Sequence, residues 1–147
     1  MKFNLIIDKN ANEEVTVIAH EPSKLTQQIE DLVMKYSGKC SIIGNKDDEM
    51  RKLNFDEIEC ITVVSRKLIA IDKGANQYRI GGTLREIEEI LPSYFIRINK
   101  STIANENCIL KFNAGFGGGV DAIFKCGYRE YVSRRCFAEI KRRFEKL

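Results

Sequence analysis

Short apolar runs separated by turn-forming residues dominate the chain from residue 50 onward. Runs of this length, rich in β-branched and aromatic residues, are typical of strands. The predicted strands are Met50–Leu53, Cys60–Val64, Lys67–Ile71, Gln77–Ile80, Phe95–Ile98, Cys108–Phe112, Val120–Lys125 and Tyr128–Val132. We therefore predict an α+β fold that is mainly β.

Two helices are predicted within and after this strand-rich part. Thr83 and Glu86 have the spacing of a capping box, and Pro92 ends the apolar stripe that follows them. A second helix is predicted from Ser133 to the C-terminus, with apolar residues spaced by three and four. These are Phe137, Ile140, Phe144 and Leu147. Basic residues occupy its other face.

The first part of the chain predicts a small α+β unit. Lys2–Ile7 and Val15–Ala19 have strand character and flank a turn-rich stretch, so we expect a hairpin. Ser23–Tyr36 has the periodicity of an amphipathic helix, with Gln27, Gln28 and Asp31 on the face opposite its apolar stripe.

A domain boundary is predicted shortly after this helix. Cys40–Ile43 resumes a short strand, and the turn-rich Gly44–Asp48 is the candidate linker. A chain of 147 residues with 44% hydrophobic content can bury one sizeable core, or one module plus a small appendage. We expect a small N-terminal region at residues 1–48 and a larger domain at residues 49–147. No signal peptide or membrane-spanning run is apparent, so we expect a cytoplasmic protein.

Catalytic, metal and nucleotide sites are disfavoured. The five cysteines are scattered and form no C-x-x-C pair, and His20, the single histidine, has no neighbours at ligand spacing. The glycine cluster at residues 115–119 is followed by a strand, so we interpret it as a hairpin connection rather than a phosphate loop. We expect no enzymatic activity, no cofactor, no metal and no small-molecule substrate.

Basic charge is concentrated in the later part of the chain. Residues 1–60 hold 8 Lys and Arg against 12 Asp and Glu, net −4, whereas residues 61–147 hold 16 against 9, net +7. Two basic runs, at residues 95–101 and 131–135, follow apolar strand-like stretches, so their cations are expected on loops. Arg134 and Arg135 would lie in the first turn of a helix, where a cation opposes the dipole. Such a pattern favours an anionic partner, with nucleic acid as the first candidate.

The ordered set of motifs from Asn54 to Leu147 resembles the LytTR domain, the β-rich DNA-binding module of bacterial response regulators of the LytR and AgrA type. The matching stretches are Phe55–Ile61, Arg66-Lys67, Leu84–Pro92, Phe95–Ser101, Ala104-Asn105 and Val132–Arg135. The resemblance implies small antiparallel sheets with few helices. It also implies that loops between strands, rather than a recognition helix, enter the grooves of duplex DNA.

The resemblance places three loops on the DNA: Ser65–Lys67, Asn99–Ser101 and Ser133–Arg135. Arginine can present a planar fork to the O6 and N7 acceptors of guanine, so we expect Arg66 and Arg134 to read bases. The expected contacts to the DNA backbone or grooves are Lys67, Asn99, Lys100, Ser101, Ser133 and Arg135. For Arg97 a structural role and a DNA contact stay open.

The function implied by the resemblance is a bacterial transcriptional regulator that binds double-stranded DNA. It is similar to the short LytTR regulators that lack a receiver domain. We expect a homodimer on repeated half-sites, and a membrane-protein inhibitor as a further partner. The N-terminal region would serve dimerisation, partner docking or packing. The alternatives are an interaction module that has kept the fold without reading DNA and, less favoured, an RNA binder.

Overall fold

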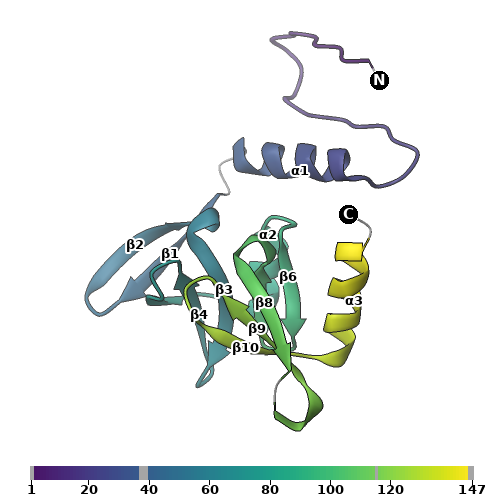
Figure 1. Ribbon diagram of the computed structural model, residues 1–147. Helices are drawn as coiled ribbons and strands as arrows, with labels where there is room; N and C mark the ends of the chain where they lie inside the picture. The colour runs from purple at the N-terminus through teal and green to yellow at the C-terminus, as the bar shows by residue number, and fades with distance from the viewer. Residues whose placement is uncertain (1, 37–39, 115, 146–147) are drawn as a thin grey trace.

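The computed structural model describes residues 2–36, 40–114 and 116–145 (Figure 1). Its helices are α1 (Lys24–Tyr36), α2 (Leu84–Ile90) and α3 (Arg134–Glu145). Its strands are β1 (Ser41–Lys46), β2 (Glu49–Asn54), β3 (Ile58–Val64), β4 (Lys67–Asp72), β5 (Gln77–Ile80), β6 (Phe95–Asn99), β7 (Thr102–Asn105), β8 (Ile109–Ala114), β9 (Val120–Phe124) and β10 (Arg129–Val132). The structure is therefore α+β and mainly β, as predicted.

The strands form two antiparallel sheets. Seven strands pair in the order β2-β1-β5-β4-β3-β7-β6, and three pair in the order β10-β9-β8. Most neighbours in these sheets are joined by hairpins, because short strands with tight turns pair most readily with the next run along the chain. The hairpin between β8 and β9 contains the glycine cluster, which confirms its interpretation as a connection; Gly115 lies outside the described residues.

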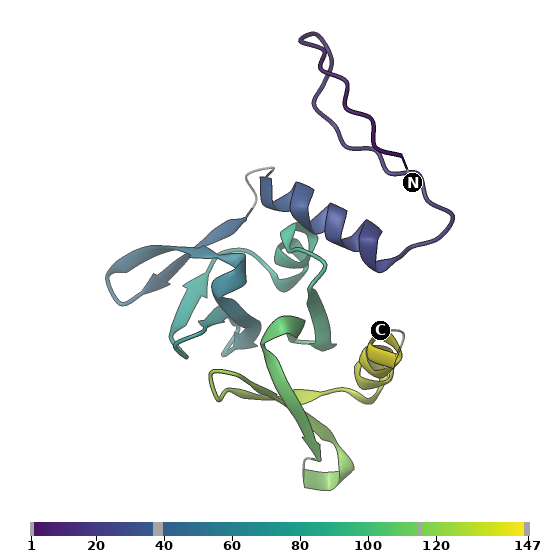
Figure 2. The same cartoon turned by 45° about the horizontal axis from the view of Figure 1, so that its top comes forward.

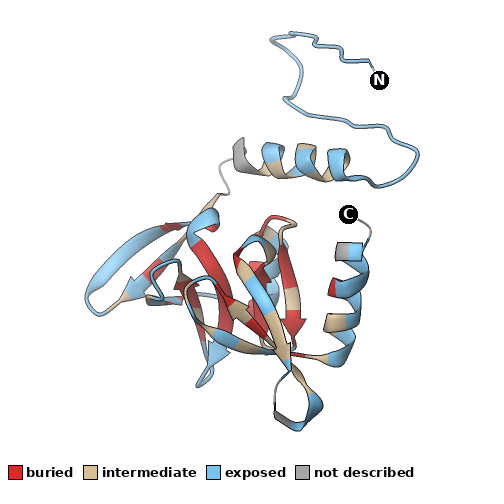
Figure 3. Ribbon diagram, in the orientation of Figure 1, coloured by how far each residue is buried: buried red, intermediate tan, exposed pale blue. Residues whose placement is uncertain are grey.

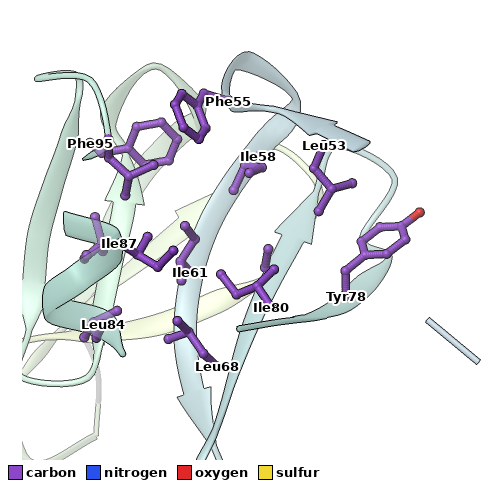
Figure 4. Close-up of a cluster of buried hydrophobic side chains, with 13 residues drawn as sticks. Leu53, Phe55, Ile58, Ile61, Leu68, Tyr78, Ile80, Leu84, Ile87 and Phe95 are labelled. Atoms are coloured by element: carbon purple, nitrogen blue, oxygen red, sulfur yellow. The ribbon is translucent and has the colours of Figure 1, made fainter. Parts of the chain in front are cut away.

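Two hydrophobic clusters form the core, one on each face of β3 (Figures 3 and 4). Ile58 and Ile61 belong to the cluster covered by α2, which is the one drawn in Figure 4. Cys60 belongs to the second cluster, which includes Phe124 of β9 and Ile140 of α3. The register of β3 against β4 shifts between Ile58 and Cys60, and such a bulge lets two residues three apart face the same side. Central strand β3 is thus buried on both faces.

Gly44 in β1 makes room for side chains of the two strands that pair with β1. A Cβ atom at this position would lie 2.7 Å from Cδ1 of Leu53 and 2.7 Å from Cβ of Tyr78. Both of those side chains are fully buried. A side chain at residue 44 would therefore collide with buried side chains of both neighbouring strands, and only glycine leaves room for them.

The local predictions for the helices are confirmed. Oγ1 of Thr83 accepts a hydrogen bond from the backbone N–H of Glu86 at 3.2 Å, as the capping box requires. Oγ of Ser133 accepts from the N–H of Cys136 at 3.2 Å, so Ser133 caps α3. Among the strands, β7 was not predicted. Within the described residues no helix is long and apolar enough to cross a membrane.

The predicted N-terminal hairpin and linker are both wrong. The structure assigns no strand within residues 2–23, and every one of these residues is exposed. Strand β1 begins at Ser41 and includes part of the expected linker, and its hairpin with β2 turns at Asp47. Because β1 also pairs with β5, the residues around the predicted boundary are part of the larger sheet. The functional division into residues 1–48 and 49–147 stays a prediction.

Helix α1 is oriented differently from the prediction. Nε2 of Gln27 donates a hydrogen bond to Oγ of Ser93, which in turn donates to Oδ1 of Asp31. Leu25, Leu32 and Val33 are exposed instead. The polar face of α1 therefore contacts the sheet domain, and much of its apolar stripe has no cover in the single chain.

Candidate nucleic-acid interface

The first predicted loop is the tight turn between β3 and β4. Ser65 and Arg66 both have positive φ angles, 50° and 66°. This pair of left-handed residues is the geometry of a hairpin turn that favours Asn-Gly. Serine and arginine adopt it at a cost, so the turn is strained. Arg66 and Lys67 are exposed here, and neither forms an ion pair within the described part of the chain.

The second loop joins β6 to β7 and is held by two side chains of β6. Oδ1 of Asn99 accepts a hydrogen bond from the N–H of Ser101 at 2.8 Å. Nη1 of Arg97 donates to the carbonyl of Lys100 at 2.7 Å, while its Nη2 lies 2.8 Å from Oε2 of Glu88. Arg97 therefore stabilises the turn, and the alternative of a structural role is the one that the geometry supports. The Lys100 side chain is left exposed.

The third loop is the junction between β10 and α3. Ser133 is half-buried and caps the helix, which begins at Arg134. Arg134 and Arg135 are exposed in the first turn, at the positive end of the helix dipole. The nearest acid to Arg135 is Glu139, at 3.9 Å across a solvent-exposed pair that contributes little. An anion at this helix end would be favoured both by the dipole and by the two guanidinium groups.

Hydrogen bonds connect the three loops in a row along one end of the protein. The N–H of Val63 donates to the carbonyl of Ser101 at 3.0 Å, which joins the first loop to the second. The N–H of Ser133 donates to the carbonyl of Ile98 at 2.8 Å, which joins the second to the third. A groove of about 840 Å³ runs between them, lined by residues of all three regions, including Val64, Lys100 and Arg135.

Asn99 holds the second and third loops together and does not point toward solvent. Its side chain is 8% exposed. Nδ2 donates to the carbonyl of Tyr131 at 2.7 Å, while Oδ1 holds the Ser101 N–H. Both ends of the amide are engaged within the protein, so Asn99 positions the two loops. Its expected contact with DNA stays a prediction.

The acidic residues that line the groove are already paired. Glu88 binds Arg97, and Oε2 of Glu130 accepts a hydrogen bond from the hydroxyl of Tyr128 at 2.8 Å. Burial, together with that hydrogen bond, raises the pKa of Tyr128, so its phenol stays protonated and continues to donate. These pairings leave Arg66, Lys67, Lys100, Arg134 and Arg135 as the exposed cations of the three loops.

Three groove residues were missed by the sequence reasoning. Tyr131, half-exposed, lines the groove beside Arg135. Thr62 and Thr102 are buried below it, and their hydroxyls lie 2.7 Å apart across the β3–β7 pair. The sequence signal for Tyr131 was its place at the start of the basic run at residues 131–135. Thr62 lies in a predicted strand, but Thr102 lies in β7, which was not predicted, so nothing local marks the pair.

The comparisons with known proteins agree with this geometry. Residues 48–145 match the LytTr DNA-binding domain family. The chain belongs to the LytTR family. Two relatives from Staphylococcus aureus, strains bovine RF122 / ET3-1 and NCTC 8325 / PS 47, are each 29% identical over 144 residues, which is 97% of this chain and 97% of theirs. Both are named as uncharacterized HTH-type transcriptional regulators.

A solved structure supports the LytTR fold. The LytTr DNA-binding domain of a Bacillus cereus protein described as a methyl-accepting/DNA response regulator superposes with a TM-score of 0.64 at 21% identity. The match covers 71% of this chain and 96% of that one. A helix-turn-helix needs two helices joined by a short turn, and in the described part of this LytTR chain strands separate α1, α2 and α3.

Proposed function

We propose that this LytTR protein is a bacterial transcriptional regulator that reads duplex DNA through the three linked loops. The observation that carries the proposal is the row of hydrogen bonds that places Arg66, Lys100 and Arg134 on neighbouring loops at one end of the sheets. Each loop is basic, and the backbone hydrogen bonds connect neighbouring regions of the three. We expect the loops to meet successive positions on a duplex.

The exposed cations divide by chemistry into two roles. Arg66 and Arg134 have free guanidinium groups that can bind guanine bidentately, each worth about 1–3 kcal/mol of discrimination between bases. Lys67, Lys100, Ser101 and Arg135 would bind phosphates, as would the free hydroxyl hydrogen of Ser133. Such contacts position the protein and weaken as salt rises.

The finer features of the function are also proposals. We infer a homodimer on repeated half-sites, since two copies joined on one DNA gain affinity by effective concentration. The exposed apolar residues of α1 are available to a partner, such as a membrane-protein inhibitor. The duplex read by such a regulator lies in the bacterial cytoplasm, where we expect the protein to act without catalytic activity.

The first experiment is selection from random duplex DNA at low and at near-physiological salt. We expect a repeated motif to be enriched at the higher salt, because base contacts persist when phosphate attraction is screened. Binding only at low salt, with no motif, would refute sequence-specific reading and favour an interaction module.

Alanine variants then test the loops on the selected site. Arg66→Ala and Arg134→Ala should each relax the preference at one base position, whereas Lys100→Ala should weaken binding to all sequences and reduce the salt slope by about 0.9. Lys73→Ala is the matched control, because Lys73 is exposed just after β4 and Lys67 stands at the other end of that strand. Lys67→Ala should therefore weaken DNA binding, whereas Lys73→Ala should not. An equal loss of DNA affinity in both variants would contradict the assignment of the loops.

A further inference from the structure

Residues 2–23 carry apolar side chains that nothing in the single chain covers. Phe3, Leu5, Ile6 and Ile7 are between 72% and 88% exposed, and Ile18 is 95% exposed. Exposed apolar residues are ordinary when scattered, but here they are concentrated in two runs of strand-like sequence. The segment therefore has the composition of two buried strands, but its apolar side chains are exposed.

The backbone of this segment is arranged for pairing but unpaired. Asp8 begins a turn, in which its carbonyl accepts from the N–H of Ala11 at 3.3 Å and its Oδ1 accepts from the N–H of Asn10 at 3.0 Å. This turn folds the run at residues 2–7 back toward the run at residues 15–19, as both views show (Figures 1 and 2). A lone two-stranded hairpin is marginal in water, and three or more strands are needed for a stable sheet.

The run from Lys2 to Asp8 is complementary to itself. In an antiparallel pair of two such runs related by a two-fold axis at Leu5, Lys2 lies opposite Asp8 and Phe3 lies opposite Ile7. The two-fold axis repeats these pairs on its other side. Each end of the paired strands therefore carries a Lys2–Asp8 charge pair, and each also carries a Phe3–Ile7 apolar pair next to it. Cross-strand pairs of these two kinds stabilise antiparallel strands, and a two-fold contact requires this reciprocity.

We propose that residues 2–8 form an intermolecular antiparallel strand pair with the same residues of a second copy. The inference rests on the dimer of the proposed function and specifies how that dimer is made. With residues 15–19 on the outer edges, two copies build a four-stranded sheet. Its apolar face would carry Phe3, Leu5 and Ile7 from each copy, and the exposed Leu25, Leu32 and Val33 of α1 follow closely in the chain to cover it.

This location leaves the DNA-binding loops free. Figure 1 shows residues 2–23 beyond α1, at the opposite end of the molecule from the junction where β10 enters α3. Two copies joined through their N-terminal segments can therefore direct their loops to separate half-sites. The segment between Ala19 and α1 is exposed and without regular structure, so it can set the distance between the two DNA-binding modules.

A charge-exchange series tests the pairing by sedimentation of the full chain. Lys2→Glu and Asp8→Lys each place like charges opposite one another at two symmetric positions, so each should weaken dimerisation roughly tenfold. Asp8→Lys also removes the hydrogen bond from the Asn10 N–H to Oδ1 of Asp8, so the double variant Lys2→Glu/Asp8→Lys is compared with Asp8→Lys alone. It restores opposite charges and should associate more tightly than that single variant. Lys9→Glu is the matched control, because it makes the same charge change just outside the paired run.

The outcomes separate this inference from the proposed function. A strictly monomeric parent chain, or a double variant no better than the single ones, would overturn the strand pairing. Binding of every variant to a duplex with one half-site is measured in parallel and should be unchanged, since residues 2 and 8 are exposed and remote from the loops. Intact dimers that bind no DNA would instead overturn the proposed function and leave the strand pairing in place.

Discussion

The strained turn at Ser65 and Arg66 offers a test in which stability and DNA binding should change in opposite directions. Replacing the pair by Asn-Gly supplies the residues that this turn geometry favours. A left-handed conformation costs an ordinary residue about 1–2 kcal/mol, and Arg66→Gly removes this cost from the folded state. Glycine also gives the unfolded chain more conformational freedom, which offsets about 0.5–1 kcal/mol of that gain. With a smaller gain at Ser65→Asn, the free energy of unfolding should rise by about 1 kcal/mol.

The same substitution removes the Arg66 guanidinium from the interface. Loss of one bidentate contact costs about 1–3 kcal/mol, which is roughly a 5- to 150-fold weaker affinity for the selected site. Chemical denaturation measures the expected rise in the free energy of unfolding, which in thermal unfolding corresponds to a rise in Tm of about 2–4 °C. Titration of labelled duplex measures the expected loss of DNA affinity.

A matched control lies at the other end of β4. Ala75 also has a positive φ of 61°, in the turn that leads to β5. Ala75→Gly should relieve similar strain without changing DNA affinity. If the Asn-Gly variant is more stable and still binds DNA as tightly as the parent, the reasoning that the strained turn exists to present Arg66 is refuted.

Three further predictions concern the groove and the core. Asn99→Ala leaves the Tyr131 carbonyl and the Ser101 N–H without their partner. It should lower the free energy of unfolding by about 1–3 kcal/mol in chemical denaturation and should also weaken DNA binding. Unchanged DNA binding would contradict the positioning role of Asn99. In alkylation followed by mass spectrometry, Cys60 should react slowest of the five thiols, because burial blocks access and raises its pKa well above the usual value; early labelling of Cys60 in the folded protein would show the opposite. Burial raises the pKa of Tyr94 from 10.0 to about 12, so the contribution of Tyr94 to stability is complete below pH 10 and is lost as pH rises through 12. Tyr94→Phe should flatten the plot of unfolding free energy against pH in this range. An unchanged slope would exclude Tyr94 as the source of this pH dependence.

Local signals in the sequence were sufficient for the helices and for most strands. Thr83, Glu86 and Pro92 act within a few residues of each other, so the bounds of α2 could be predicted from them alone. Strand β7 has no such signal, because Thr102–Asn105 becomes a strand only by pairing with β3 and β6 on either side. The hairpin predicted for the N-terminal runs fails because two strands alone are marginal in water, and no third strand of the described chain pairs with them.

The candidate site was predicted to a similar extent. Basic residues at the ends of apolar runs identified the second and third loops, and the resemblance to the LytTR family supplied the first, Ser65–Lys67. Arg66, Lys100 and Arg134 are all exposed in the structure. Their DNA contacts stay predictions. The role of Asn99 could not be predicted, because it depends on the carbonyl of Tyr131, 32 positions away in the sequence. Sequence patterns located the charges, whereas the supports beneath them depend on contacts across the fold.

Strand β3, buried on both faces, has a consequence for how the protein melts. Its own Glu59 accepts a hydrogen bond through Oε1 from the N–H of Cys126 at 2.9 Å, which connects the large sheet to the turn between β9 and β10 of the small one. Neither sheet can lose its structure without exposing this shared strand. Calorimetry of residues 40–145 should therefore show a single transition whose van't Hoff and calorimetric enthalpies agree. The three loops would then fold and unfold together, so that a cell would hold only fully folded or fully unfolded copies of the protein.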